Sequence, residues 1–242
     1  MQPMRMRAVS VALGVGLAAG LLAAPAWAGS DEVETPIGSL SVQIDGGVFT
    51  EECTDFPYEV VVTGAAAEVQ WSARIDATGS RGATANALTT GMGSQSVEGE
   101  IMICSSGGTG HGTWTAAVSV QLRNTVDTTE VFNRAMEVTF TVSKATSVVT
   151  ITGITESSSA TKVKGTVIDT NGNTATTMFG YVEVLVKKSG WTSWRSKGEG
   201  QVSENGRFTV KLNRAYPEGT KVKVKFRGTD EAKSATSDIS RI

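Results

Sequence analysis

Apolar residues recur at every second position in segment after segment of the second half of the chain, and no segment there repeats with the period of a helix. In residues 221–227, for example, Val222, Val224 and Phe226 alternate with charged residues. Such alternation is typical of strands with one buried face. The pattern predicts about seven strands, the number expected of an immunoglobulin-like sandwich, within 148–153, 163–167, 181–186, 191–202, 208–212, 221–227 and 234–242.

Two details refine this second unit. Residues 181–186 are apolar on both faces, which indicates a central strand. Asn205-Gly206 predicts a hairpin between 191–202 and 208–212, because both residues tolerate positive φ.

The first half has the same character, with short alternating segments separated by Gly, Ser and Asn. The candidate strands are 39–44, 58–63, 69–75, 96–104, 113–122 and 131–142. We therefore expect an all-β chain of two immunoglobulin-like β-sandwich domains in tandem.

Charge separates the two halves. Residues 29–145 contain 15 acidic and 5 basic residues, whereas residues 146–242 contain 9 acidic and 15 basic residues. This asymmetry predicts an acidic domain at 29–145 and a basic domain at 146–242. Opposite charges should attract the two units, within one chain or head to tail between chains, mainly at low salt.

The N-terminus predicts export. Arg5 and Arg7 precede an apolar run at 8–24, and Ala26-Trp27-Ala28 is a small-x-small cleavage site. Residues 1–28 are therefore interpreted as a signal peptide, with no membrane span in the mature chain. The sequence also has no sortase-type motif or apolar C-terminal tail, so we expect a secreted, extracellular protein whose association with a cell wall would be non-covalent.

The two cysteines of the chain, Cys53 and Cys104, both lie in the acidic half. In an oxidising compartment they are expected to form a disulfide. The order Cys53, Trp71, Cys104 is that of immunoglobulin domains, but residue 102 is Met where those domains carry a tyrosine, and Cys53 precedes Pro57 in a loop-like stretch. We interpret the bond as a staple at the end of a sheet.

Turn and strand motifs in the second half are similar to those of a known family. They lie at 167–173 (VIDTNGN), 180–184 (GYVEV), 205–210 (NGRFTV), 218–220 (EGT) and 226–230 (FRGTD). Residues 146–242 resemble the bacterial Ig-like repeat domains of secreted and surface proteins, which implies a spacer or adhesive module without a catalytic residue. The N-terminal half, through 53–71, 99–104 and 112–114, resembles small secreted disulfide-containing β-sandwich domains of actinobacteria.

Candidate chemistry is sparse. His111 is the only histidine and lies in a glycine-rich tract at 107–112, and no Gly-x-Ser-x-Gly elbow is present. One histidine and two bonded cysteines are too few for a zinc site. Residues 169–173 begin like a calcium loop, but Gly180 stands where the twelfth-position Glu is required, so we interpret them as a turn. We expect no enzyme activity, no cofactor and no metal.

Two groups of residues are candidates for ligand binding. Lys221, Lys223, Lys225 and Arg227 should share one strand face at intervals of about 6.6 Å, where they would either meet a polyanion or protect an exposed strand edge. Trp191 and Trp194 are three residues apart, so in a regular strand one points outward, either as a platform for a sugar or as cover for the core.

The sequence therefore favours a secreted, non-enzymatic interaction or adhesion module of the extracellular space or the cell surface. Its expected partners are a cell-wall polymer, a polysaccharide or another surface protein. Nucleic acid is excluded as a partner for an exported chain with a net negative charge. The alternatives are a carbohydrate-binding protein and a secreted protease inhibitor, although the inhibitor would need a rigid loop and the glycine-rich tract 105–112 is expected to be mobile.

Overall fold

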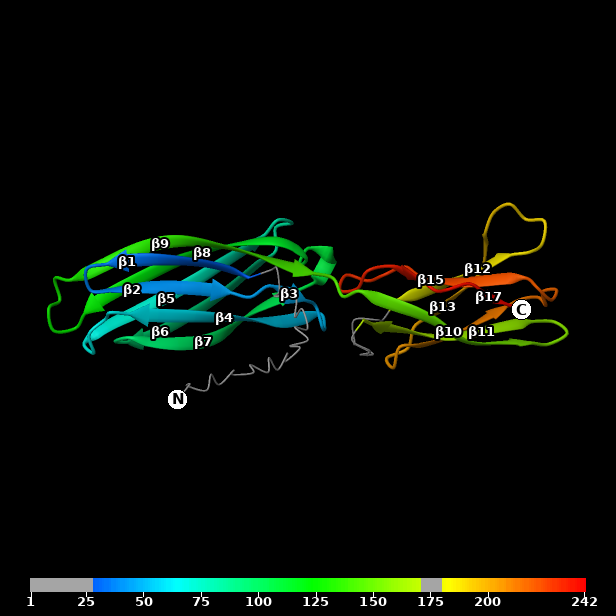
Figure 1. Cartoon of the computed structure of the whole chain (residues 1–242), viewed down its shortest axis with the longest axis horizontal. Helices are drawn as coiled ribbons and strands as arrows, with labels where there is room; N and C mark the ends of the chain where they lie inside the picture. The colour runs from blue at the N-terminus through cyan, green and yellow to red at the C-terminus, as the bar shows by residue number, and fades with distance from the viewer. Residues whose placement is uncertain (1–27, 171–179) are drawn as a thin grey trace, which may run out of the picture.

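A computed structural model describes residues 28–170 and 180–242. Within these residues the chain is almost entirely β-structure, which confirms the predicted class. Figure 1 shows two sandwiches placed end to end along the long axis. The predicted signal peptide, apart from its last residue, and the segment Asn171-Gly172-Asn173 of the calcium-loop candidate lie outside the described residues.

The first sandwich consists of two sheets. One sheet has the order β1 (Gly29–Thr35), β2 (Gly38–Ile44), β4 (Cys53–Thr63) and β7 (Gln95–Cys104). The other has the order β3 (Gly47–Val48), β9 (Val131–Ser143), β8 (Gly112–Asn124), β5 (Val69–Gly79) and β6 (Thr84–Met92). A short 3-10 turn, η1 (Ser106–Gly108), lies in the connection between β7 and β8.

The second sandwich repeats this plan with fewer residues. One sheet contains β10 (Ser147–Glu156), β11 (Thr161–Asp169) and β14 (Arg207–Leu212). The other has β13 (Arg195–Gln201), β12 (Tyr181–Lys187) and β15 (Lys221–Phe226), and β15 also pairs with the short strands β16 (Ala235–Thr236) and β17 (Ser240–Arg241). As predicted, β12 is a central strand.

The two sandwiches share one topology. β1 and the two-residue β3 are left out of this comparison. In each unit the first, second and fifth of the remaining strands form one sheet. The other sheet has the fourth, third and sixth strands in that order, followed by the strand or strands that end the unit. Immunoglobulin constant-type domains also have the first, second and fifth strands in one sheet and the third, sixth and seventh in the other, but their fourth strand lies in the first of these sheets, whereas here it pairs with the third strand. The structure therefore confirms two β-sandwiches and differs from that arrangement in the position of the fourth strand.

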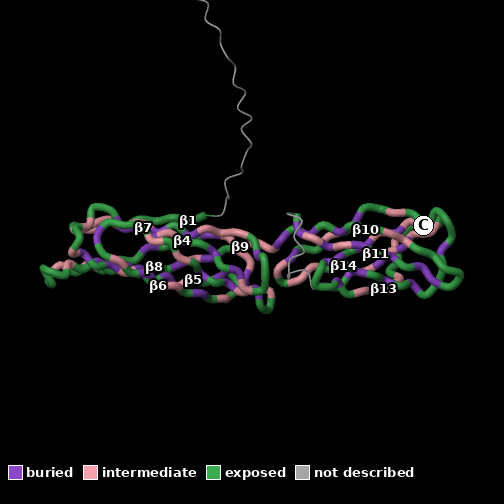
Figure 2. Tube along the Cα trace, turned by 90° about the horizontal axis from the view of Figure 1, so that it is seen from below, coloured by how far each residue is buried: buried purple, intermediate pink, exposed green. Residues whose placement is uncertain are grey.

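Alternation of side chains produces a separate apolar core in each unit. In β4 every second residue from Thr54 to Val62 is buried, and in β15 the same holds for the three apolar residues among the lysines. The first core includes the fully buried Trp71 and Trp114, and the second is centred on valines and Phe226. Figure 2 shows buried positions along the strands and exposed ones at the loops.

Several sequence expectations need correction. β1 and β6 were not predicted, because their apolar alternation is weak. The Asn205-Gly206 turn is present, with Gly206 at φ 70°, but β13 and β14 join opposite sheets and do not form a hairpin. Turn chemistry reverses the chain locally, whereas the choice of sheet is decided by packing, and β14 pairs with β11 instead.

The stretch around Cys53 is also not a loop, since Cys53 and Pro57 both lie within β4. Pro57 is tolerated there because β2 ends its pairing with β4 at Tyr58, and the Pro57 carbonyl then accepts a bond from Asp45 N. The missing N–H of Pro57 therefore faces no strand partner.

A strap of backbone bonds joins the two sandwiches. Ala145 N donates to Glu231 O at 2.7 Å, and Lys233 N donates to Ala145 O at 2.8 Å. The Lys144 ammonium donates to the Thr229 carbonyl at 2.6 Å. Ala145 itself packs into the second core. These bonds hold the junction end to end, so the sheet faces of the two units are not stacked on each other (Figure 1).

Candidate functional site

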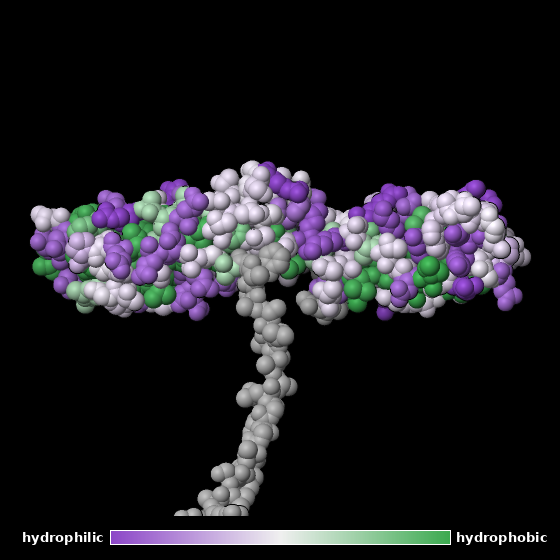
Figure 3. All heavy atoms as spheres, turned by 45° about the horizontal axis from the view of Figure 1, so that its top comes forward, coloured by the Kyte–Doolittle hydropathy of each residue, from purple (hydrophilic) through white to green (hydrophobic). Residues whose placement is uncertain are grey.

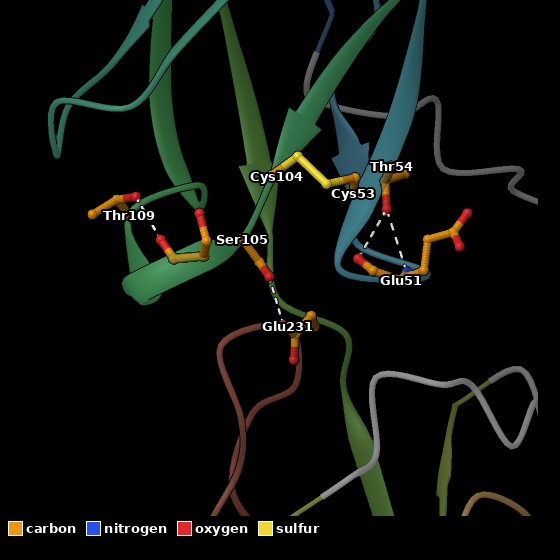
Figure 4. Close-up of a disulfide and its surroundings, with 8 residues drawn as sticks. Glu51, Cys53, Thr54, Cys104, Ser105, Thr109 and Glu231 are labelled. Carbon is orange, nitrogen blue, oxygen red and sulfur yellow. Dashed lines mark hydrogen bonds between the residues drawn. A yellow bond between two sulfur atoms is a disulfide. The ribbon is translucent and has the colours of Figure 1, made fainter.

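The disulfide is present between Cys53 and Cys104. The two residues lie opposite each other in the register of β4 and β7, at the start of one strand and the end of the other. The bond therefore staples one end of a single sheet, as predicted, and does not cross between sheets as in antibody domains. Figure 4 shows that it lies beside Ser105, the first residue after β7.

The glycine-rich tract after Cys104 is anchored by hydrogen bonds from several side chains. Ser105 Oγ donates to the Glu231 carboxylate of the second sandwich at 2.5 Å (Figure 4). Arg81 donates to Gly108 O, and the Trp114 indole donates to Gly110 O. These bonds anchor a tract whose glycines predict a mobile loop, and its mobility stays a prediction. The tract lies against the junction and does not project as an inhibitory loop would.

His111 lies in the same region and lacks the partners of a catalytic histidine. Its Nδ1 atom is buried without a hydrogen bond, and no serine hydroxyl or carboxylate bonds to its ring in the part of the chain that the structure describes. The pKa of His111 is lowered, first by burial and then by the nearby cations Arg81 and Lys144, against a smaller opposing effect of Asp230. The ring is therefore neutral near pH 7, but nothing orients it toward a nucleophile.

The predicted row of cations is formed on the outward face of β15. Lys221, Lys223 and Lys225 alternate with buried Val222, Val224 and Phe226, as expected. Register adds Lys187 of β12 opposite Lys221 on one side and Arg241 of β17 opposite Lys221 on the other. We call this surface the basic face and define it as Lys187, Lys221, Lys223, Lys225, Arg227 and Arg241.

The two ends of the basic face differ in charge balance. Toward the junction, Arg227 forms an ion pair with Glu199, and Lys225 stands opposite Glu183 in the register. Away from the junction the neighbours of Lys221 are Lys187 and Arg241, which are also cations. No salt bridge involves Lys187, Lys221, Lys223 or Arg241 among the described residues. Like charges directly opposite each other destabilise a sheet, so this end keeps an unfavourable arrangement that a bound anion would relieve.

A pocket of about 280 Å³ lies at this end. We call it the distal pocket and define it by its charged and aromatic lining, Lys187, Lys188, Trp191, Lys221 and Arg241, which Ser189, Gly190 and Gly219 complete. Figure 1 places the chain end beside β17 on the half of the second sandwich that faces away from the first.

The two tryptophans do not lie in a strand, because β13 begins only at Arg195. The rule of opposite faces therefore does not apply, and both side chains are half-buried. The Arg195 guanidinium lies 4.5 Å from the centroid of the Trp191 ring, and the Lys223 ammonium lies 4.7 Å from that of Trp194. Cations approach both rings, so neither is the bare platform that a neutral sugar stacks on.

The first sandwich presents the opposite charge. The sheet of β1, β2, β4 and β7 contains no Lys or Arg. Its outward positions carry Glu32, Glu34, Asp55, Glu59, Glu98 and Glu100, and Glu59 stands directly opposite Glu98. Within one chain the end-to-end junction keeps the acidic sheet and the basic face apart (Figure 1). The attraction between chains that follows from the charge asymmetry stays a prediction.

Sequence reasoning missed the residues that complete the distal pocket. Lys187, Lys188 and Arg241 are separated from Lys221 by 20 residues or more, and their proximity follows from sheet order alone. The available signal was the pair Lys187-Lys188, which directly follows the predicted central strand at 181–186 and lies close to Trp191 in the sequence. Arg241 gave no signal, because β17 is too short to show a period.

Large apolar side chains such as Leu88 and Val126 are exposed singly, and Figure 3 shows hydrophobic residues as separate spots among hydrophilic ones on the face in view. Over residues 28–170 and 180–242, no group of His, Cys, Asp or Glu side chains is arranged to hold a metal ion. A helix of sufficient length and hydropathy to cross a membrane is likewise missing from these residues.

Comparison with known proteins yields no family: no family model and no curated protein matches the chain. Among solved structures it is similar to the BSP domain of a biofilm-associated protein, at 16% identity and a TM-score of 0.28, over 83% of this chain and 29% of that one. Red sea bream transglutaminase is similar at 14% identity and a TM-score of 0.35, over 86% and 31%.

A third similar structure is a tetra-tandem repeat in the extending region of a large adhesion protein, at 15% identity and a TM-score of 0.38, over 85% of this chain and 56% of that one. The chain thus spans less than two thirds of each of the three structures. At these TM-scores the similarities do not bear on function.

Proposed function

We propose that the chain is an exported, non-enzymatic interaction module with a signal peptide at 1–28 and domains at 29–145 and 146–242. The basic face of the second domain binds an anionic polymer of the cell surface without a covalent link. The observation that carries this proposal is the set of outward cations Lys187, Lys221, Lys223 and Arg241, for which no described carboxylate forms a salt bridge.

The geometry of the basic face suits a polymer better than a single small ion. Successive lysines of β15 are about 6.6 Å apart along the strand, and neighbouring strands are about 4.8 Å apart across it. Each exposed ion pair contributes only about 0.2–1 kcal/mol, so useful affinity needs several contacts at once. A chain with repeated negative charges supplies them, because after the first contact the others form within one complex.

The same contacts separate the proposal from its rivals. Cations lie against the rings of Trp191 and Trp194, which favours an acidic over a neutral saccharide. Ser105 donates to Glu231, and Gly108 and Gly110 accept bonds from Arg81 and Trp114, so the glycine-rich tract is not presented as a free inhibitory loop.

Retention on an insoluble anionic polymer tests the proposal. We would compare the wild-type chain with K221Q/K223Q/K225Q on purified anionic wall polymer and on the same polymer after its anionic groups are removed. The matched control is K162Q/K164Q/K211Q, which removes three outward lysines from the opposite sheet of the same domain. All six lysines are at least partly exposed on strands, so both variants should keep the wild-type melting temperature.

We expect the first variant to bind the anionic polymer roughly tenfold more weakly. The control should change this affinity by less than threefold, and neither protein should be retained on the neutralised polymer. Equal affinity of wild type and K221Q/K223Q/K225Q would contradict the proposal, and so would an equal loss in the two variants. Retention on the neutralised polymer that is lost in W194A would favour the carbohydrate-binding alternative instead.

A further inference from the structure

The geometry points to a specific binding site for a phosphate group in the distal pocket. The inference rests on the proposed function, since it names the group that the basic face holds most tightly. Lys187, Lys221 and Arg241 form a row across three hydrogen-bonded strands, and Lys188 and Trp191 line the same pocket of about 280 Å³.

The backbone holds these side chains in place. Arg241 is fixed beside Lys221 because Gly219 N donates to Ile242 O at 2.7 Å and Ile242 N donates to Thr220 O at 3.0 Å. Trp191 N donates to Lys188 O at 3.1 Å, which closes the turn through Gly190 at φ 80°. The Lys188 ammonium lies 5.6 Å from the centroid of the Trp191 ring and 5.2 Å from that of Tyr216. The pocket is therefore built on three strand ends and a closed turn.

The composition of the row favours phosphate over carboxylate. A carboxylate has two oxygens in one plane and is satisfied by a single Arg fork. A phosphate has more oxygens in a tetrahedral arrangement, which can accept from the Arg241 fork and from two lysine ammonium groups on the other side. The Trp191 ring lines the same pocket, but the Arg195 guanidinium lies 4.5 Å from its centroid, so the ring brings a further cation beside the pocket and not an open surface for a sugar. The ligand class is thus a phosphate group carried by a polymer or a lipid.

Another pair of lysines shows that like charge alone does not make such a pocket. Lys162 and Lys211 also stand directly opposite each other, on the outward face of the other sheet. Among the described residues that pair has neither a third cation opposite it nor an aromatic ring within cation–π distance, and it does not line the distal pocket. It serves as an internal reference for nonspecific attraction of anions.

Titration with pyrophosphate, followed by tryptophan fluorescence of the full secreted chain, tests the pocket. Citrate serves as a carboxylate anion of similar charge. The variant K187Q/R241Q removes two pocket cations outside the β15 row, and K223Q/K225Q removes two β15 lysines outside the pocket. K162Q/K211Q removes the reference pair. Trp191→Phe should abolish the fluorescence change that pyrophosphate causes, whereas Trp194→Phe should retain it.

We expect K187Q/R241Q to weaken pyrophosphate binding about tenfold. K223Q/K225Q and K162Q/K211Q should change it by less than threefold, and wild type should prefer pyrophosphate to citrate by more than fivefold. Equal losses in K187Q/R241Q and K162Q/K211Q, or equal affinity for the two anions, would overturn the pocket assignment. A pyrophosphate signal that persists unchanged in both Trp191→Phe and K187Q/R241Q would overturn it as well.

Two further arms separate the sources of the phosphate and the two proposals. Beads that carry poly(glycerol phosphate) represent a wall polymer, and vesicles of phosphatidylglycerol in phosphatidylcholine represent a lipid surface. Binding to the beads and not to the vesicles supports a wall source, and the reverse supports a lipid source. If K221Q/K223Q/K225Q releases the polymer while K187Q/R241Q does not, the pocket is wrong and the basic face stands. If no variant affects polymer binding, the proposed function fails too.

Discussion

The hydroxyl of Ser105 donates a 2.5 Å hydrogen bond to the carboxylate of Glu231, 126 residues further along the chain (Figure 4). Ser105 is completely buried and follows Cys104 directly, so the disulfide end of the first sandwich is connected to the second through one side chain. The same Glu231 also accepts from Ala145 N through its backbone oxygen. One residue of the second sandwich thus receives two of the bonds that hold the junction.

Removal of this bond should loosen the junction without unfolding either sandwich. A hydrogen bond to a charged group contributes about 1.5–3 kcal/mol, so S105A should raise the population of locally open junctions roughly tenfold or more. We expect faster hydrogen exchange at the amides of Ala145 and Lys233. S106A, which changes the exposed neighbouring serine, should leave both exchange rates unchanged. Unchanged rates in S105A would show that the backbone strap alone holds the junction.

Loss of the disulfide should destabilise the first sandwich selectively. The bond closes a loop of 51 residues, which corresponds to about 4 kcal/mol in the chain-entropy model. C53S/C104S should therefore lower the melting transition of the first sandwich and leave that of the second, which has a separate core without cysteine. Differential scanning calorimetry resolves the two transitions. A shift of both transitions by the same amount would contradict separate cores.

His111 should make stability depend on pH. Its pKa is lowered in the folded state, mainly by burial, from an unfolded value of about 6.5. Between the two values the unfolded state binds more protons, so the free energy of unfolding rises with pH there and is constant above about pH 6.5. It decreases as the pH falls below 6.5. H111Q should remove this slope in chemical denaturation measured from pH 5.5 to 7.5, and an identical slope in H111Q would assign the dependence to other groups.

Much of the fold could be predicted because alternation reports burial directly. Residues 221–227 show one apolar face, and the structure buries that face of β15 as expected. Residues 181–186 show two apolar faces; β12 is a central strand as expected, but only one of its faces is buried, since Tyr181 is exposed and Leu185 is half-buried. β1 and β6 escaped prediction because their burial is interrupted, so their sequence shows little period. Pro57 indicated a loop for a different reason. It lies within β4, but the pairing of β4 with β2 ends at Tyr58, so no partner residue of β2 requires the N–H that Pro57 lacks.

The candidate site could be predicted only in part. The row on β15 is local in sequence, so its face followed from a period of two residues. The distal pocket depends on register, because Lys187 and Arg241 meet Lys221 only through pairing between strands far apart in the chain. The environment of Trp191 and Trp194 was mistaken because a regular strand was assumed where β13 has not yet begun. Pairing order of this kind is not encoded in local periodicity.

The salt dependence of binding to long-chain inorganic polyphosphate tests most directly whether the cations of the basic face make the contacts. Each cation that neutralises a phosphate releases counterions, so the logarithm of the affinity falls linearly with the logarithm of salt concentration. We expect K221Q/K223Q/K225Q to reduce the steepness of this line by roughly 2 relative to wild type. K162Q/K164Q/K211Q should keep the wild-type slope. Equal slopes for all three proteins, or equal reductions in the two variants, would contradict binding through the basic face.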